Sequence, residues 1–473
     1  MSDVNDQALE TAMAAVDAAF PALCAQLADL VRVPSCSFPG HDPQHLQAGA
    51  EATAACLRAA GFPAVELLDD GPWPPYVLAT DHRAGPNAPC VLLYAHYDVQ
   101  PIGRDELWTS PAYEPEERAG RLYGRGSADD KAGIAAIAGA CSAWLHDGAL
   151  PCNVTVWIEG EEEIGSPHLE AFLDAHIDKL RCDALVIADL GNVQTGAPTL
   201  TVSLRGMVSA TIQARALAGP LHSGMWGGPA PDVVQLLCRA LGSVSDAEGR
   251  LCVPGIAIPE PSAQALADLE RVPYDAAAMA ASMGVVPGGG DLSDGVRAYR
   301  RCWYEPVFSI NAIHAGGAPG AAGNIINDCA WARVSVRIVS GMDPDATLTA
   351  LAAHVRSQLP SWLQCEIAAE QSAEAWATTT DHPLFAICHA AFARGYGVEP
   401  VQVGCGGTIP FVGVLSERLG GVPALLVPVE DPDTRAHAEN ESVHLGDLRK
   451  TTRSLAAFLG MAGAVKKRGD RAQ

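Results

Sequence analysis

Short apolar runs that alternate with a helical pattern are the feature that most constrains how this chain can fold. Residues 90–95 ("CVLLYA"), 154–159 ("VTVWIE") and 184–189 ("ALVIAD") are mostly apolar and have the length of strands. Residues 131–145 ("KAGIAAIAGACSAWL") lie between the first two runs and suit a connecting helix. Strand–helix–strand units of this kind build a mostly parallel, helix-flanked sheet. The sequence therefore predicts an α/β fold whose ligands gather at the carboxyl ends of the strands.

The pattern changes after about Leu200 and returns from about His382. In between, residues 200–217 and 329–339 alternate polar and apolar side chains, which is typical of a sheet with one open face. Residues 245–323 are rich in Pro and Gly and are expected to be irregular. We therefore predict a smaller α+β unit inserted into the first domain. The predicted domains are 1–201 with 379–473, and 202–378 for the insertion; the tail 466–473 is expected to be disordered.

An excess of acidic residues narrows the range of partners. The 473 residues include 31 Lys and Arg but 55 Asp and Glu, for a formal net charge of -24. Such a protein is repelled by phosphate backbones and anionic lipids, so neither nucleic acid nor a membrane is expected as a partner. The N-terminal residues 1–35 lack the features of a signal peptide, and the helical spacing of their apolar residues from Leu9 to Leu30 predicts an amphipathic helix. We find no uninterrupted apolar segment of membrane-spanning length. Fourteen dispersed cysteines suggest reduced, mostly buried thiols and a cytoplasmic protein.

Charged residues follow each of the predicted parallel strands. His96 and Asp98 come after the first strand, three glutamates at 161–163 follow the second, and Asp189 ends the third. Because the carboxyl ends of parallel strands meet at one edge of a sheet, these side chains should converge. Carboxylates crowded in this way repel each other unless a cation or a proton is present.

The segment 124–133 ("GRGSADDKAG") precedes the predicted helix and allows several interpretations. Its glycines could cradle a phosphate, but the spacing differs from that of a P-loop and acids occupy the place of the phosphate. Nucleotide binding is therefore disfavoured. Either Asp129 or Asp130 could instead cap the helix.

Two histidines and three carboxylates form a candidate set of metal ligands: His96, Asp129, Glu163, Asp189 and His437. Imidazole mixed with carboxylate oxygens suits zinc, manganese or cobalt. By formal count, two divalent ions bring about +4, which three carboxylates and one bridging hydroxide roughly cancel. The composition of the set therefore favours two ions.

Seven motifs, in this order, resemble one known family: "LLYAHYDVQP", "LYGRGSADDKAG", "IEGEEEIGS", "VIADLGN", "LHSGMWGG", "GCGGTIPFV" and "AHAENE". It is the dinuclear-metal aminoacylase and carboxypeptidase family, which includes carnosinase-like dipeptidases, succinyl-diaminopimelate desuccinylase and acetylornithine deacetylase. The resemblance covers nearly the whole chain. It implies a zinc-peptidase-like catalytic domain with an inserted lid and dimerisation domain.

The resemblance also implies how the ligands are shared. His96 and Asp189 would hold one metal, Glu163 and His437 the other, and Asp129 would bridge both beside a cis peptide bond to the next residue. Two divalent ions per subunit are expected, zinc first, with manganese or cobalt as alternatives.

Further roles follow from the same resemblance. Asp98 would hold the ring of His96, and Glu162 would be the general base that takes a proton from a metal-bound water and passes it to the leaving amine. His222 would reach the partner subunit's active site and stabilise the tetrahedral oxyanion, which predicts a homodimer through the lid. A helix cap or a core position is the alternative for His222. Glu161 is expected to face solvent.

Four residues are candidates for substrate binding: Arg337, Asn324, Gly407 and Thr408. Arg337 matches the arginine that binds a substrate carboxylate in carnosinase-like relatives, although an arginine in a strand could equally be an ordinary surface residue.

One departure from the family pattern concerns the loop before Thr408. Gly404 and Cys405 stand where carnosinase-like relatives carry Arg and Glu, so a guanidinium expected near the substrate is missing. Arg435 could compensate for it.

The expected activity is hydrolysis of the amide bond of dipeptides or short peptides by a dinuclear metallopeptidase. The long lid segment 299–317 resembles that of the larger dipeptidases and favours this branch. An N-acyl amino acid deacylase or desuccinylase with the same machinery is the alternative. A non-catalytic metal-binding interaction protein is disfavoured, because Glu162 and all five ligand candidates are present.

Overall fold

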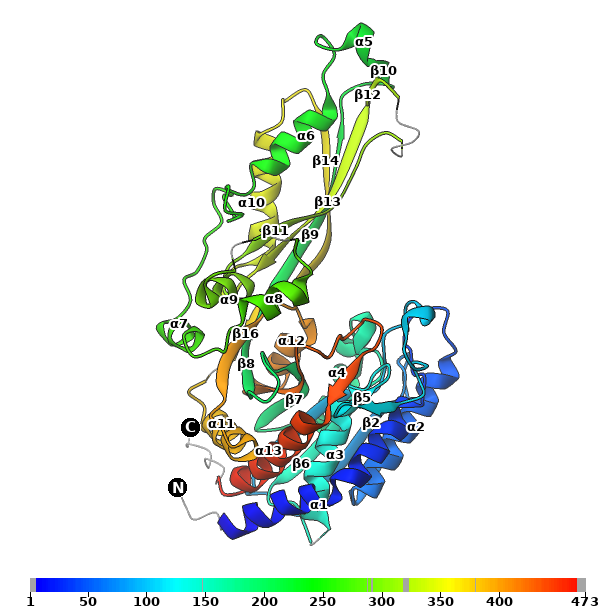
Figure 1. The fold of residues 1–473 in the computed structure, drawn as a ribbon, viewed down its shortest axis with the longest axis vertical. Helices are drawn as coiled ribbons and strands as arrows, with labels where there is room; N and C mark the ends of the chain where they lie inside the picture. Colours follow the sequence, from blue (N-terminus) through cyan, green and yellow to red (C-terminus); the bar gives the residue numbers. More distant parts are fainter. Residues whose placement is uncertain are drawn as a thin grey trace.

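The computed structural model describes residues 6–465 except 147, 287, 291, 318–322 and 379. Within this part the molecule is elongated, with a nine-stranded sheet at one end and a four-stranded sheet at the other (Figure 1). The predicted tail 466–473 lies outside the described residues.

The larger sheet is parallel at its centre and antiparallel at its edges. The central strands β6, β3, β7 and β17 run parallel, so their carboxyl ends meet at one edge. The predicted α/β fold with a mostly parallel sheet is thereby confirmed. The strand order is β1 (Ala64–Leu68), β2 (Tyr76–Asp81), β6 (Asn153–Glu159), β3 (Cys90–His96), β7 (Ala184–Gly191), β17 (Ala424–Glu430), β8 (Thr199–Leu204) and β15 (Trp376–Ala377), with β16 (Val401–Cys405) paired to β8.

Helices cover both faces of this sheet because its strands are apolar on both faces. In β3, Val91 and Leu93 join one core while Leu92 and Tyr94 join the other. The first core includes residues of α1 (Asp6–Val31), α2 (Pro43–Ala59), α3 (Lys131–Leu145), α11 (Pro383–Tyr396) and α13 (Leu445–Gly463); the second includes residues of α4 (Leu169–His176) and α12 (Pro410–Arg418). A small sheet lies beside the larger one: β4 (Glu116–Arg118), β5 (Arg121–Tyr123) and β18 (Ser442–His444).

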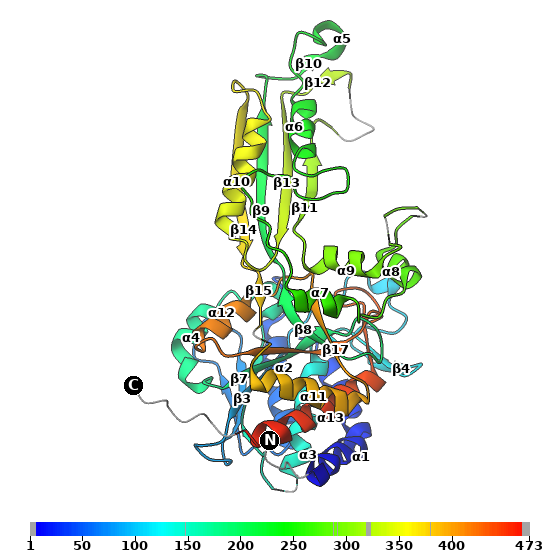
Figure 2. The same ribbon diagram turned by 90° about the vertical axis from the view of Figure 1, so that its left-hand side faces the viewer.

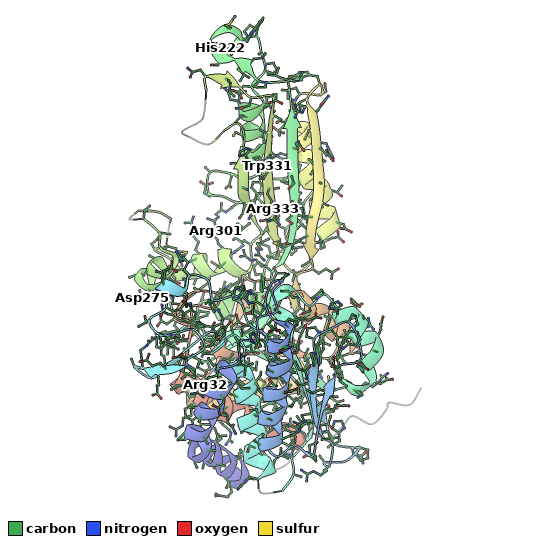
Figure 3. The ribbon with its side chains drawn as sticks, turned by 90° about the vertical axis from the view of Figure 1, so that its right-hand side faces the viewer. Arg32, His222, Asp275, Arg301, Trp331 and Arg333 are labelled. Atoms are coloured by element: carbon green, nitrogen blue, oxygen red, sulfur yellow. The ribbon has the colours of Figure 1, made fainter. Side chains whose placement is uncertain are left out.

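The smaller unit, called the lid below, is an antiparallel sheet with helices on one face. Its strands run along the long axis of the molecule (Figure 2). Trp331 and Arg333 are exposed on the face without helices (Figure 3). The strand order is β11 (Val307–His314), β13 (Cys329–Ile338), β9 (Gly206–Arg215) and β14 (Gln364–Ala373); α6 (Val233–Gly242) and α10 (Pro344–Ser357) share its core. The far tip carries β10 (Leu221–His222), α5 (Ser223–Trp226) and β12 (Ile325–Ile326).

Two predictions about this region need correction. Residues 200–217 are not one strand, because the chain passes from β8 in the larger sheet to β9 in the lid at Arg205. The Pro/Gly-rich segment is also not irregular throughout: it contains α7 (Ala263–Leu269), α8 (Ala276–Met283), α9 (Gly295–Trp303) and β11. The domain boundaries stay a prediction, with β8 and β15 both paired into the larger sheet.

Helix α1 is long and apolar enough to cross a membrane by length and composition alone, although the sequence analysis expected no segment of that kind. Its apolar side is used in packing. Met13, Val16 and Leu27 are buried in the core shared with α3 and α13, which confirms the predicted amphipathic helix.

All fourteen cysteines lie in the described part of the chain, and none of them forms a disulfide. The expectation that most are buried is only partly correct. Cys238, Cys252 and Cys302 of the lid are exposed.

The aromatic stack on the second face of the larger sheet provides a test of this core. Trp157 of β6 is fully buried and stacks on Phe172 and Tyr76, with ring centroids 5.6 and 5.8 Å away. We expect Trp157→Ala to lower the free energy of unfolding by about 3–5 kcal/mol, because it leaves a cavity that neighbours fill only partly. Urea denaturation followed by far-UV circular dichroism measures this. The control is Trp362→Ala, whose side chain is exposed; equal effects of the two variants would contradict this packing.

Candidate metal centre

The carboxyl ends of the central strands bring the predicted ligands together. His96 ends β3, Asp189 lies in the last part of β7, and Glu163 is in the turn η2 (Glu162–Ile164) that follows β6. Asp129 comes from the loop before α3, and His437 from the loop between β17 and β18. Ligand atoms of His96, Asp129 and Asp189 lie within 4.8 Å of one another, and so do those of Asp129, Glu163 and His437. The two groups share Asp129.

The two oxygens of Asp129 face different histidines. Oδ1 lies 3.1 Å from Nε2 of His96, and Oδ2 lies 2.9 Å from Nε2 of His437. Asp189 completes the first group, with Oδ1 3.7 Å from the His96 ring. Glu163 completes the second, with Oε2 3.3 Å from Nε2 of His437. This is the arrangement expected of a carboxylate that bridges two cations.

The chemistry of these donors fits divalent cations. Nε2 of His96 is buried and makes no well-formed hydrogen bond, although two carboxylates lie near it. Burial, and after it the charge of Asp129, raises the pKa of Glu163 to about 7. Burial also raises the pKa of Glu162 well above its usual range, with the charges of Asp189 and Asp129 acting in the same direction. A cation among these groups would remove the repulsion.

Asp98 holds two parts of the site at once. Nδ1 of His96 lies 3.0 Å from the backbone carbonyl of Asp98 and 3.4 Å from its carboxylate. The carboxylate oxygens of Asp98 accept the backbone N–H groups of Glu162 and Glu163, at 3.1 and 3.0 Å. The sequence indicated the contact with His96, whereas the second role depends on the fold of the turn. Asp98 therefore orients the ring and the glutamate turn together.

The two acids of the "ADDK" motif divide their roles. Asp130 is the N-cap of α3: it accepts the backbone N–H of Gly133 at 3.1 Å and that of His96 at 3.2 Å. Asp129 points instead into the ligand cluster, and the peptide between the two residues is cis. Asp130 thus confirms the cap, while Asp129 remains the predicted ligand.

Glu441 is a structural residue that the sequence analysis missed. It is fully buried and forms an ion pair with Arg125. Its carboxylate also accepts the backbone N–H groups of Gly126, Ala128 and Asp129, at 3.0 to 3.1 Å. Because Glu441 lies four residues after His437, it ties the loop of one ligand to the loop of another. The motif "AHAENE" contained this residue, but only tertiary contacts reveal its partners.

The loop that carries His437 has an unusual backbone. Arg435, His437 and Asn440 have φ angles of 57°, 63° and 61°, in the left-handed region that L-residues seldom adopt. Asn440 anchors this loop, because its side chain donates to the carbonyl of Leu107 and accepts the N–H of Thr109. Backbone strain of this kind is concentrated at functional sites.

The expectation that Glu161 faces solvent is wrong. Its side chain is buried, and its carboxylate accepts hydrogen bonds from the hydroxyl of Tyr76 at 3.0 Å and from the backbone N–H of His168 at 3.1 Å. The His168 ring lies 2.8 Å away as well. The turn after β6 therefore directs Glu161 into the protein and leaves Glu162 and Glu163 for the site.

Three of the four substrate-binding candidates lie together. The guanidinium of Arg337 donates to the hydroxyl of Thr408 at 2.5 Å, and Gly407 is the preceding residue of the same loop. Asn324 lies elsewhere, at the lid tip, where its carbonyl accepts the N–H of Ser223 at 2.9 Å.

His222 also lies at the lid tip, far from the ligand cluster of its own chain (Figure 3). Its Nδ1 accepts the backbone N–H groups of Gly224 and Met225, at 3.1 and 3.3 Å, so it caps α5. The capping alternative is therefore present in the single chain. The predicted role in the partner subunit stays a prediction.

Several known dipeptidases are similar to this chain over most of its length. A cysteinylglycine-S-conjugate dipeptidase of Corynebacterium striatum is 29% identical over 432 residues, which cover 89% of this chain and 91% of that protein. A human β-Ala-His dipeptidase is 27% identical over 404 residues, covering 83% and 79% of the two chains. The crystal structure of human carnosine dipeptidase 1 superimposes with a TM-score of 0.79 at 25% identity, over 97% of this chain and 99% of that one.

A protein-family model also matches most of the chain. The model of peptidase family M20/M25/M40 matches residues 92–460, a range that holds the whole ligand cluster and the lid. The chain is therefore a member of peptidase family M20/M25/M40.

Proposed function

We propose that this chain is a dinuclear metal-dependent dipeptidase. The observation that carries the proposal is the pair of ligand groups that share Asp129, each with one histidine and one further carboxylate. The substrate class is supported by the relatives, which are named as dipeptidases and match the chain over most of its length. Because these relatives are named as dipeptidases, we propose dipeptides as substrates in preference to N-acyl amino acids, which the alternative deacylase activity would cleave.

The proposed ligands follow from the distances. His96 and Asp189 would hold one ion, Glu163 and His437 the other, and Asp129 both. Zinc is the proposed metal because imidazole and carboxylate donors suit it, with manganese or cobalt as alternatives. When bound, such ions polarise the scissile carbonyl and lower the pKa of a water molecule.

Glu162 is the proposed general base. Its carboxylate lies at the edge of the cluster, 4.0 Å from Nε2 of His96, and its backbone is fixed by Asp98. It would take the proton of the attacking water and deliver it to the leaving amine. Burial raises the pKa of Glu162, and a desolvated carboxylate is a stronger base than a solvated one.

The other substrate contacts are proposed at the loop of Thr408. Arg337 and Thr408, already in contact, would bind the carboxylate of the substrate. His222 and Asn324 would act from the lid tip of the second subunit of a homodimer. The cytoplasmic location expected from the sequence also stays a prediction.

Hydrolysis by the metal-loaded protein tests the function. We expect unmodified dipeptides to be cleaved faster than N-acyl amino acids. Glu162→Gln should lower kcat by about 10²–10⁴-fold, because an amide cannot accept the proton. Product formation is followed by chromatography, with the exposed Glu117→Gln as the matched control. Cleavage confined to N-acyl substrates would reverse the substrate assignment, and unchanged turnover in Glu162→Gln would remove Glu162 as the base.

Metal content tests the shared ligand. We expect stripped protein to bind two divalent ions per chain and its melting temperature to rise on binding, because the ions bind the folded state and neutralise buried carboxylates. Asp129→Ala should weaken both sites, whereas Asp189→Ala should weaken one. Calorimetric titration and elemental analysis give the stoichiometry. Two tightly bound ions in Asp129→Ala, or full activity of stripped protein, would contradict the dinuclear assignment.

Complementation tests the in-trans role of His222. Mixing Glu162→Gln with His222→Ala subunits should restore about a quarter of wild-type activity, since half of the dimers are mixed and each holds one intact site. Activity is measured after subunit exchange, which labelled subunits monitor. Exchange without recovery would exclude the role.

A further inference from the structure

The loop that departs from the family pattern has no room for the missing arginine. A Cβ atom at Gly404 would lie 2.5 Å from Cβ of Trp303, the last residue of α9. Trp303 is itself largely buried, in a small core with Val403 of the neighbouring β16. An arginine side chain at position 404 would therefore collide with the lid.

Another guanidinium lies on the same loop. Arg205, at the passage from β8 to β9, donates from Nε to the carbonyl of Gly406 at 3.1 Å. Its backbone N–H donates to the carbonyl of Cys405 at 3.2 Å. Nη2 of Arg205 also lies against Gly406: a Cβ atom added at this glycine would be 2.9 Å from it. Arg205 is thus held against the loop that leads directly to Thr408.

Arg205 and Arg337 are neighbouring positive charges. Arg337 pairs across the lid sheet with Met207, two residues after Arg205, and its guanidinium contacts Thr408. Burial lowers the pKa of Arg205, and the charge of Arg337 lowers it further. Arg205 and Arg337 therefore both contact the short loop of residues 405–408.

Neither arginine pairs with a carboxylate in the described part of the chain. Other arginines near the site do: Arg121 with Asp431, and Arg125 with Glu441. In a chain of net charge -24, two adjacent and partly buried like charges without a carboxylate are unfavourable. Such a pair is well suited to an anionic ligand, because guanidinium groups bind carboxylates in a planar, bidentate manner.

Electrostatic interactions link this loop to Glu430, and Glu430 to two of the proposed metal ligands. Burial, and more weakly the charge of Glu430, raises the pKa of the Cys405 thiol. Burial and the charges of Asp129 and Asp189 in turn raise the pKa of Glu430. The same loop carries Thr408, whose hydroxyl contacts Arg337, the arginine proposed to bind the substrate carboxylate.

We propose that Arg205 is a second substrate-binding cation, which together with Arg337 selects dipeptides whose C-terminal residue is aspartate or glutamate. This inference rests on the proposed function. Arg337, with Thr408, receives the α-carboxylate as proposed above, and Arg205 receives the side-chain carboxylate. A C-terminal residue with a neutral side chain leaves the partly buried guanidinium of Arg205 without a partner, and this unfavourable state lowers the affinity for such a substrate.

A pair of isosteric substrates tests the proposal, Gly-Glu against Gly-Gln. We expect wild-type protein to favour Gly-Glu by about tenfold or more in kcat/KM, the range of a charge-assisted hydrogen bond. Arg205→Met should bring this ratio close to one, mainly through KM for Gly-Glu, and Arg205→Lys should retain part of it. The matched control is Arg333→Met, an arginine on the open face of the lid sheet that pairs with Glu370 (Figure 3). A wild-type ratio near one, or an unchanged ratio in Arg205→Met, would overturn the proposal.

Binding of the free products separates this proposal from the proposed function. L-glutamate should bind the metal-loaded protein more tightly than L-glutamine, and Arg205→Met should lose the difference, in calorimetric titrations that need no turnover. If no dipeptide is cleaved but this difference is found, the proposed function fails and the role of Arg205 stands. Equal binding of both amino acids rejects the role of Arg205. Circular dichroism shows whether Arg205→Met is folded.

Discussion

The carboxylate of Asp129 is the constraint on which the rest of the site depends. Its two oxygens face histidines from opposite ends of the sequence, His96 and His437. The two ligand groups can share Asp129 only if the segments that carry His96, Asp129 and His437 are held in fixed positions relative to one another. The parallel core supplies His96 and Asp189 directly, because both come from strands whose carboxyl ends meet.

The other ligands come from loops, and buried acids hold these loops in place. Asp98 binds the turn of Glu162 and Glu163 through two backbone N–H groups. Glu441 binds the backbone before Asp129 in the same way. Carboxylates thus serve two purposes here: some are available to cations, and others replace the missing regular hydrogen bonds of the loops.

Features that depend on residues close together in the sequence could be predicted from the sequence. The strands of the parallel core and helix α3 follow from apolar runs of the right length, and the converging acids follow from the rule that parallel strands end at one edge. The break at Arg205 was missed because both sides of it have strand patterns. Glu161 was misassigned because the direction of a side chain in a turn depends on backbone angles that its sequence does not specify.

By itself, the sequence determined the fold class and the family and supplied the proposed set of metal ligands, since ordered motifs and the residues at strand ends are local properties. Only the tertiary structure decided that Asp129 faces both histidines, that Asp130 caps a helix, and that Arg205 lies against the loop of Thr408. These are contacts between segments as far as about 300 residues apart in the chain. No local pattern contains such distances, because they arise when the two sheets and their helices pack together.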